Sequence, residues 1–174
     1  GEMPVANVAM ALKDATGTVI ATTQTDGSGY YSFTNLAAGD YSVLVVASNF
    51  ATGGALVAAL SSDPLTASSN NLADDDHDHG INPASLSDYT SDGVSSGSVT
   101  LGAGLPTTEG GPITPNGDTN NNQTIDFGFY RQTLGNLIWE DTDQNGWLES
   151  GELPYTRGTI EVALLDASTG AVVQ

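Results

Sequence analysis

The 174-residue sequence has no cysteine, only 3 lysine and arginine residues, and no apolar run near the length of a membrane span. Without cysteine the chain has no disulfide framework and no thiol chemistry, so its stability depends on core burial, hydrogen bonds and any bound metal. Against so few cations stand 21 Asp and Glu residues, and the formal net charge is −18. This charge disfavours binding to nucleic acid and insertion into a membrane, and it suits either a soluble acidic surface or a protein that holds cations.

Helical signals are also scarce. The nearest candidate for a helix is residues 53–62, whose Ala and Leu residues would form one or two turns. No signal peptide is recognisable, and the opening GEMPVANV resembles an internal piece of a longer chain, so targeting is not readable from the sequence.

Short segments of alternating apolar and polar residues dominate the sequence, and this period of two predicts β-strands. Gly- and Asp-rich turns separate the strands, as in DATG, DGSG and AAGD. The predicted strands are residues 5–14, 18–25, 29–36, 40–48, 98–103, 123–131 and 136–141. The expected inward side chains are those of Val8, Met10, Leu12, Tyr31, Phe33, Tyr41, Val43 and Val45. We therefore expect an all-β fold, with long polar loops over residues 61–97 and 103–122.

An internal repeat divides the chain. Residues 1–24 align with residues 151–174, and eight positions match. The matched residues are Gly1, Glu2, Pro4, Ala11, Leu12, Asp14, Ala15 and Gly17 with Gly151, Glu152, Pro154, Ala163, Leu164, Asp166, Ala167 and Gly170. We expect a β-sandwich over residues 1–132 that lacks its own first strand and calcium loop. Residues 133–174 would then be the first strands and calcium loop of the next repeat, or a segment donated to a neighbouring copy.

The acidic run 141–152 fits the calcium-loop pattern D-x-[DN]-x-[DN]-G-x5-E without a mismatch. Ca²⁺ takes six to eight hard oxygen ligands, and alternate residues of a tight loop turn inward to supply them. The predicted ligands are Asp141, Asp143, Asn145, the carbonyl of Trp147, Glu149 and Glu152. Gly146 would allow the sharp bend. The alternative is a solvated Asp/Asn turn. Because no helices flank the run, we expect an EF-hand-like loop between strands.

Glu2 occupies the position of Glu152 in the first copy of the repeat. It is therefore predicted to be the closing ligand of a loop shared with the preceding repeat. If a neighbouring copy donated its segment 134–150, the site at Glu2 would be completed, and copies would assemble head-to-tail. Alternatively, successive repeats belong to one continuous polypeptide, and the sequence leaves both arrangements open.

A second acidic cluster occurs at residues 73–80, ADDDHDHG. Three interpretations stay open: a second calcium site, a solvated acidic loop, or a zinc or copper site at His77 and His79. The candidate calcium ligands are Asp74, Asp75, Asp76 and Asp78.

Two further aspartates and the two tryptophans also have expected roles. Asp26 and Asp40 are expected to form turns. Trp139 alternates with core residues and is expected to be buried, whereas Trp147 is the better candidate for an exposed ring that stacks on sugar.

The order of these segments resembles the calcium-binding B-type repeat domains of bacterial surface adhesins, the serine–aspartate-repeat B-like group. The group is related to collagen-adhesin B-type and transthyretin-like sandwiches. TDGSGYYSFTNLAAGDYSV (25–43) and DTDQNG (141–146) carry most of the resemblance, which covers nearly the whole chain. It implies a Greek-key, immunoglobulin-like or prealbumin-like β-sandwich, extracellular or cell-surface location, Ca²⁺ binding, and a stalk or adhesive role.

Enzymatic and cross-linking roles find little support. The isopeptide bond of collagen-adhesin relatives needs a lysine, but Lys13 is the sole lysine and its repeat counterpart is Leu165. Asp126 could be the acceptor of such an isopeptide bond, but the other residues that the bond requires are incomplete. A hydrolase would need a positioned acid, base or nucleophile, and no such set is recognisable, so we expect no enzyme.

The favoured function is therefore a structural repeat of an extracellular stalk, fibre or filament, stiffened by Ca²⁺ and in contact with neighbouring copies of itself. The alternative is an adhesin module that grips a protein or glycan through the loops of residues 61–122. Tyr89 is the one aromatic residue in those loops, which favours the structural role.

Overall fold

The computed structural model describes residues 3–62, 78–102, 122 and 125–173. The chain divides into two compact units, Gly1–Gln132 and Thr133–Gln174. Over the described residues the first unit consists mainly of short antiparallel strands, which confirms the all-β fold class. Neither short helix in the described part of the chain has the length and apolarity needed to cross a bilayer.

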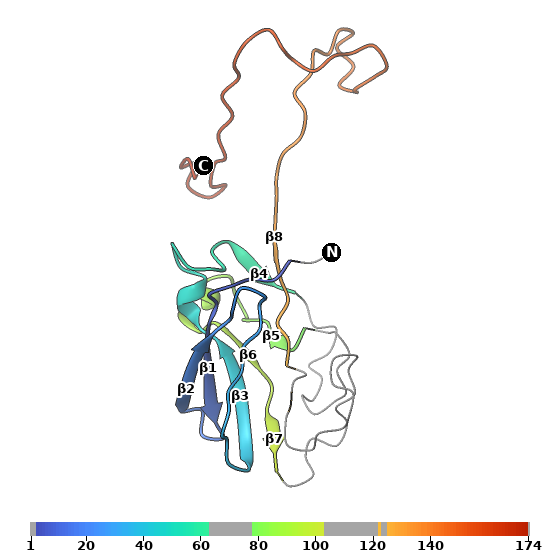
Figure 1. The fold of residues 1–174 in the computed structure, drawn as a ribbon. Coiled ribbons are helices and arrows are strands. Elements are labelled where there is room, and N and C mark those ends of the chain that lie inside the picture. The colour runs from blue at the N-terminus through green and yellow to red at the C-terminus, as the bar shows by residue number, and fades with distance from the viewer. Residues whose placement is uncertain (1–2, 63–77, 103–121, 123–124, 174) are drawn as a thin grey trace. The chain divides into compact units, whose positions relative to one another are not determined.

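The larger sheet of the first unit is centred on β1 and β3. Its order is β2 (Val19–Gln24), β1 (Ala9–Asp14), β3 (Gly39–Val45), β6 (Val94–Ser96) and β5 (Gly80–Ile81), and β7 (Val99–Leu101) also pairs with β3. Figure 1 shows β2, β1 and β3 side by side. β1 pairs antiparallel with both neighbours, so that Met10 lies opposite Thr23 on one side and Val45 on the other.

The smaller sheet consists of β4 (Ala59–Ser61) and β8 (Phe129–Arg131), with Leu60 opposite Tyr130. Two helical turns, η1 (Ala47–Asn49) and α1 (Asp88–Ser91), complete the named elements of the described chain. The ring of Phe50, which follows η1, packs edge to face against the ring of Tyr89 in α1, with 5.2 Å between the ring centroids. These contacts connect the turns to the sheets.

The core contains the side chains that alternation along the strands places inward. Val8, Met10 and Leu12 are almost fully buried, as the sequence predicts. They pack in one cluster with Val43, Val45, Phe50, Leu56, Ala59, Tyr89, Val94, Val99 and Ile125. The first unit therefore has one continuous hydrophobic core.

The nearest candidate for a helix, residues 53–62, forms no helix. Residues 53–58 form turns, and β4 follows them. Ala58 adopts a positive φ of 57°, which ends any helical run before the strand. Leu56 is nevertheless fully buried, so the apolar residues of this segment fill the core from a turn.

The strand expected over residues 29–36 forms no ladder. At its start the Asp26 carboxylate captures the backbone N–H groups of Ser28 and Tyr30, and at its end Asn35 has a φ of 59°. The predicted alternation persists, because Tyr31 packs against the core and donates a hydrogen bond to the Ile125 carbonyl at 2.7 Å. Burial, and next the charge of Asp126, raises the pKa of the Tyr31 phenol.

Part of the long loop expected over residues 61–97 is ordered structure, since β5, α1 and β6 lie within it. These elements are too short for periodicity to reveal them. Asp40, expected in a turn, lies in β3 and accepts a hydrogen bond from the Thr100 hydroxyl at 2.6 Å. Within the strand expected over residues 123–131, the structure assigns β8 at Phe129–Arg131.

In the second unit, the strand expected over residues 136–141 is reduced to one bridge between Trp139 and Pro154. Proline has no N–H to donate, which limits the ladder at this point. Trp139 is partly buried. Backbone bonds from Tyr155 to Ile138 (2.9 Å) and from Glu140 to Leu153 (3.1 Å) flank the bridge and close the base of the acidic loop.

Candidate metal centre

The acidic loop brings three carboxylates together. Oxygens of Asp141, Asp143 and Glu152 all lie within 4.8 Å of one another. These residues are 11 positions apart at most in the sequence, and the paired segments around Trp139 and Pro154 return the chain so that Glu152 meets the two aspartates. The result is a compact group of oxygen donors with a formal charge of −3.

Asp141 organises the backbone of the loop. One of its carboxylate oxygens accepts the N–H groups of Gln144 (2.7 Å) and Asn145 (3.2 Å), and the other accepts that of Gly146 (2.9 Å). These bonds, with Gly146 the strongest influence, lower the pKa of the Asp141 carboxyl. Gly146 has a φ of 80°, a conformation that glycine adopts without strain. Asp141 is therefore held charged and fixed in place.

The other predicted ligands follow the same turn. Asn145 donates its side-chain amide to Asp143 at 2.7 Å and accepts the Trp147 N–H at 2.7 Å. Glu149 donates its backbone N–H to Glu152 at 3.2 Å, and its side chain is exposed, outside the group of three. The Trp147 ring is 74% exposed. Asn145 thus lies at the group, and Glu149 takes part through its backbone.

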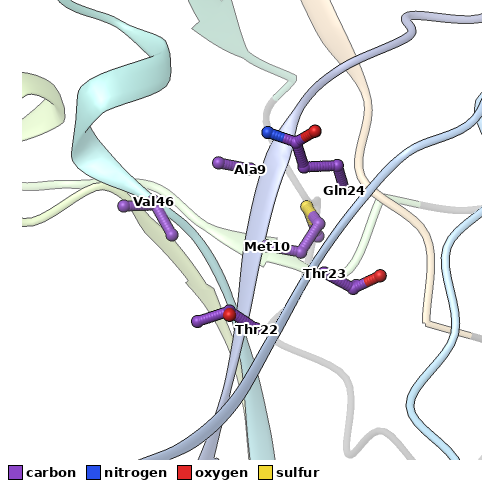
Figure 2. A pocket seen from close by; sticks show the side chains of 6 residues that line it. All are labelled: Ala9, Met10, Thr22, Thr23, Gln24 and Val46. Atoms are coloured by element: carbon purple, nitrogen blue, oxygen red, sulfur yellow. The ribbon is translucent and has the colours of Figure 1, made fainter.

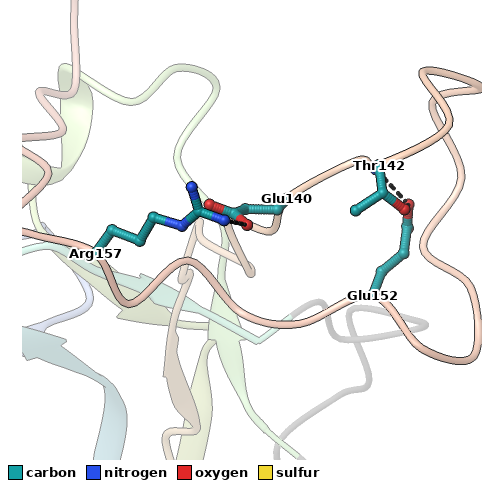
Figure 3. A network of polar contacts seen from close by, with 4 residues as sticks. All are labelled: Glu140, Thr142, Glu152 and Arg157. Carbon is teal, nitrogen blue, oxygen red and sulfur yellow. Dashed lines mark hydrogen bonds and ion pairs between the residues drawn. The ribbon is translucent and has the colours of Figure 1, made fainter.

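Two contacts that the sequence did not predict hold the closing residue. Glu152 accepts the backbone N–H of Thr142 at 2.9 Å and is also contacted by its hydroxyl at 3.4 Å, as Figure 3 shows. Below the loop, Arg157 pairs with Glu140 at 2.7 Å. This ion pair is largely exposed and contributes at most about 1 kcal/mol. The only sequence feature that could have indicated the role of Thr142 is its position between the predicted ligands Asp141 and Asp143.

The chemistry and spacing of this donor set fit Ca²⁺. Calcium binds oxygen at about 2.3–2.6 Å, so ligands on opposite sides of one ion are up to about 5 Å apart. The 4.8 Å spread of the three carboxylates falls within this limit. No thiol or imidazole lies in the group, which disfavours a soft transition metal. Three negative groups so close repel one another, and a cation would relieve this repulsion.

The second predicted cluster is described only in part, because Asp74, Asp75, Asp76 and His77 lie outside the described residues, as does Glu2. Asp78 accepts hydrogen bonds from Gly80 (2.8 Å) and Ser61 (3.2 Å), and burial raises its pKa. His79 is buried and its Nδ1 accepts the Asp126 N–H at 3.3 Å. The Nδ1 atom of His79 is therefore already engaged in a hydrogen bond, and a zinc or copper site at His77 and His79 stays a prediction. Calcium at this cluster stays a prediction.

The larger sheet carries a shallow hollow near the ends of β1 and β2. Figure 2 shows its lining, which consists of Ala9, Met10, Thr22, Thr23, Gln24 and Val46. These side chains are apolar, hydroxyl or amide groups, and none of them titrates near neutral pH. The hollow therefore offers no acid, base or metal ligand.

Comparisons with known proteins match both parts of the chain. The family described as "SdrD B-like domain" matches residues 1–129. Serine-aspartate repeat-containing protein D of Staphylococcus aureus (strain Newman) is 31% identical over 154 residues, 87% of this chain and 8% of that protein. Serine-aspartate repeat-containing protein E of Staphylococcus aureus (strain USA300) is 30% identical over 154 residues, which are 87% of this chain and 10% of that protein.

A third relative is Serine-aspartate repeat-containing protein F of Staphylococcus epidermidis, which is 27% identical over 173 residues. This match covers 98% of the chain, and so extends into the second unit, but only 8% of the relative. The chain thus spans about a tenth or less of the length of these relatives. No solved structure gives a significant match.

Proposed function

The chain belongs to the SdrD B-like domain family, and on that premise we propose that it is a structural repeat of an extracellular, cell-surface stalk or filament. It carries no catalytic role. Its neighbours are further repeats of the same kind, arranged head-to-tail. Calcium held in the acidic loop stiffens the connection between one sandwich and the next.

The observation that carries the proposal is a β-turn built twice by the same chemistry. In the first unit the Asp14 carboxylate accepts the backbone N–H and hydroxyl of Thr16. In the second unit Asp166 does the same for Ser168. Glycines with φ of 82° and 69° follow, at Gly17 and Gly170. A turn repeated at the matched positions of an internal repeat supports a modular, tandem architecture.

The calcium part of the proposal rests on the three converging carboxylates. Asp141, Asp143 and Glu152 supply hard oxygens, and Asn145 adds an amide oxygen at the same turn. A bound Ca²⁺ would supply the positive charge that keeps these groups together. Because the ligands come from both ends of a twelve-residue loop, binding would restrict residues 141–152, near the start of the second unit.

A recognition role through the long loops has less support. Tyr89 is the one aromatic residue in the sequence of residues 61–122. It is buried against Phe50, and its hydroxyl accepts the backbone N–H of Ser61 at 3.3 Å. Tyr89 thus serves the core and is not available to stack on a ligand. This favours a mechanical function over a binding module.

A distance measurement across the loop tests the proposed stiffening. Because the chain has no cysteine, the double variant Thr22→Cys/Ala167→Cys labels each unit once at an exposed position with a fluorophore. Single-molecule energy transfer is then recorded with millimolar Ca²⁺ and with chelator. We expect the distance distribution to narrow with Ca²⁺. The same labelled chain carrying Asp141→Asn and Glu152→Gln is the control, and it should keep the broad distribution in both conditions.

An equally broad wild-type distribution with and without Ca²⁺ would contradict the stiffening role. Mg²⁺ provides a second comparison, because it requires a tighter octahedral shell than this loop of spread carboxylates offers. Narrowing by Mg²⁺ at the same concentration would show that the loop does not select Ca²⁺ over Mg²⁺.

A further inference from the structure

The acidic loop contains an asparagine that is followed directly by glycine, Asn145 and Gly146. In such a pair the backbone nitrogen of the glycine can attack the side-chain carbonyl of the asparagine, and no Cβ on the glycine hinders the approach. Both residues are exposed. An added Cβ at Gly146 would meet no atom within 4 Å, so solvent reaches the reacting atoms. The pair is therefore a candidate for deamidation.

Deamidation at this pair needs water as its only co-reactant. The Gly146 nitrogen loses its proton to a base from the solvent and forms a bond to Cγ of Asn145, and the bond from Cγ to Nδ2 breaks. The amide nitrogen takes up protons from water and leaves as ammonia, so that a cyclic succinimide remains. Water then opens the ring. Addition at Cγ gives aspartate, whereas addition at the main-chain carbonyl gives isoaspartate, whose backbone runs through Cβ and Cγ.

The folded loop engages each of the reacting groups. The N–H of Gly146 donates to Oδ2 of Asp141 at 2.9 Å. The Nδ2 group of Asn145 donates to Oδ2 of Asp143 at 2.7 Å, and its Oδ1 accepts the N–H of Trp147 at 2.7 Å. The attacking nitrogen, the leaving nitrogen and the carbonyl oxygen are thus all held by hydrogen bonds.

These contacts affect the reaction in opposite directions. The bond from Trp147 polarises the side-chain carbonyl, which favours attack at Cγ. The bond to Asp141 opposes attack, because it keeps the proton on the Gly146 nitrogen. Loss of that proton would create a negative charge beside the carboxylate. Since attack requires the loss of this proton, the contact with Asp141 controls the rate.

We propose that Asn145–Gly146 is a deamidation site, and that the hydrogen bond from the Gly146 N–H to Asp141 slows the reaction in the folded loop. A group protected by local structure reacts through its open state, so breaking this bond releases the reaction. The effect on the candidate metal centre rests on the proposed calcium role. The calcium-loop pattern accepts Asp or Asn at position 145, so the aspartate product adds a carboxylate, whereas isoaspartate lengthens the loop backbone.

Mass spectrometry of the aged protein tests the proposal. The full chain is incubated with chelator at mildly alkaline pH and digested at intervals, and the Asn, Asp and isoaspartate forms at position 145 are separated by chromatography. A synthetic peptide of residues 143–148, which lacks Asp141, should deamidate at least about tenfold faster than the intact chain. Asn116–Gly117, the other Asn-Gly pair of the sequence, is followed in the same samples as the reference for pH and temperature.

Matched variants identify the contact responsible. Asp141→Asn removes the carboxylate charge and should accelerate deamidation at Asn145 about tenfold. Asp166→Asn removes the same charge from a turn of the same unit and should leave the rate within about twofold. Glu152→Gln changes the residue that accepts the Thr142 N–H but keeps the contact with Asp141, so its rate should also stay within about twofold.

Acceleration by Asp141→Asn alone, with an unchanged rate at Asn116, supports the proposal. Equal rates in the intact chain and the peptide, equal acceleration by Glu152→Gln, or an Asn145 that stays intact in Asp141→Asn while Asn116 reacts would overturn it. Because chelator is present throughout, the result does not depend on calcium binding. Failure of this test therefore leaves the proposed calcium role to be judged by the calcium titrations.

Discussion

At the scale of single residues, Asn49 shows how one buried amide holds the first unit together. It accepts the Ala9 N–H at 2.8 Å and donates to the carbonyls of Ala9 and Val46, both at 2.8 Å. Asn49 thereby caps the start of β1 and the end of β3 with one side chain. No periodic or motif signal in the sequence indicated this role.

We predict that Asn49→Ala lowers the free energy of unfolding of the first unit by about 2–4 kcal/mol, because it leaves buried backbone groups without partners. The change is measured by unfolding in urea, monitored by far-UV circular dichroism. Thr22→Ala, on the exposed side of the edge strand, is the control and should cost less than about 1 kcal/mol. Equal losses for the two variants would contradict this role of Asn49.

The turn at Asp166 makes a prediction about pH. Hydrogen bonds from the Ser168 hydroxyl, and then from Thr169 and the Ser168 N–H, lower the pKa of the carboxyl from 3.8 to about 2. Because the folded pKa is depressed, the stabilisation is complete above pH 4 and is lost as the pH falls toward 2. The ¹³C shift of the carboxyl carbon should titrate with a midpoint near 2. A midpoint near 3.8 would show that the turn does not form in solution.

At the scale of elements, alternation predicted the strands that lie at the centre of the fold. β1 and β3 were recoverable because Val8, Met10, Leu12, Val43 and Val45 recur every second residue. The segment 29–36 has the same alternation but no ladder, since strand pairing depends on partners that local sequence does not contain. Elements of two to four residues such as β5 and α1 offered too few positions for any period.

The residues between α1 and β6 pass close to the end of β3, and this gives a prediction at Gly93. Its φ is 76°, and an added Cβ would lie 2.2 Å from the Val45 carbonyl oxygen. We expect Gly93→Ala to destabilise the first unit by more than about 2 kcal/mol, since both the backbone conformation and the contact become unfavourable.

Gly27 is the matched control for this substitution. It has no positive φ, and no atom lies within 4 Å of the position of an added Cβ. Gly27→Ala should change the free energy of unfolding by less than about 1 kcal/mol in the same urea experiment. A Gly93→Ala variant as stable as Gly27→Ala would contradict the close contact between Gly93 and the Val45 carbonyl.

The acidic loop yields the corresponding prediction for metal binding. Gly146 has open space around it, so Gly146→Ala costs only its backbone conformation, about 1–2 kcal/mol. We expect calcium affinity to fall roughly tenfold. Terbium luminescence sensitised by the exposed Trp147 measures it by competition with Ca²⁺. Gly158→Ala, in the same unit and without a positive φ, should leave affinity unchanged, and equal effects of the two variants would contradict the loop geometry.

At the scale of the whole molecule, the sequence indicates the candidate site more directly than the fold, because the candidate ligands are close together in the sequence. A twelve-residue pattern contains Asp141, Asp143, Asn145 and Glu152 together, and the turn that joins them is local. The hydrogen bond from Thr142 to Glu152 was not predictable, because it depends on the return of the chain after Trp139. The ligands expected at Glu2 and Asp74–Asp76 stay predictions.

The two copies of the internal repeat differ in burial. In the first copy β1 has its β3 neighbour and a core, whereas the second copy exposes Val162 and Leu164 at the positions of Met10 and Leu12. The chain carries a net charge of −18 and has 3 lysine and arginine residues, so a bound cation would relieve the repulsion among the carboxylates at Asp141.

The central claim is that calcium occupies the acidic loop, and the amide signal of Gly146 tests it most directly. This N–H donates to Asp141 at 2.9 Å, so a cation on the carboxylate should change its chemical shift. Titration of the ¹⁵N-labelled chain with CaCl₂ is predicted to give a saturating shift at Gly146 that chelator reverses and that Asp141→Asn abolishes. A Gly146 signal unmoved at millimolar Ca²⁺ would contradict the account.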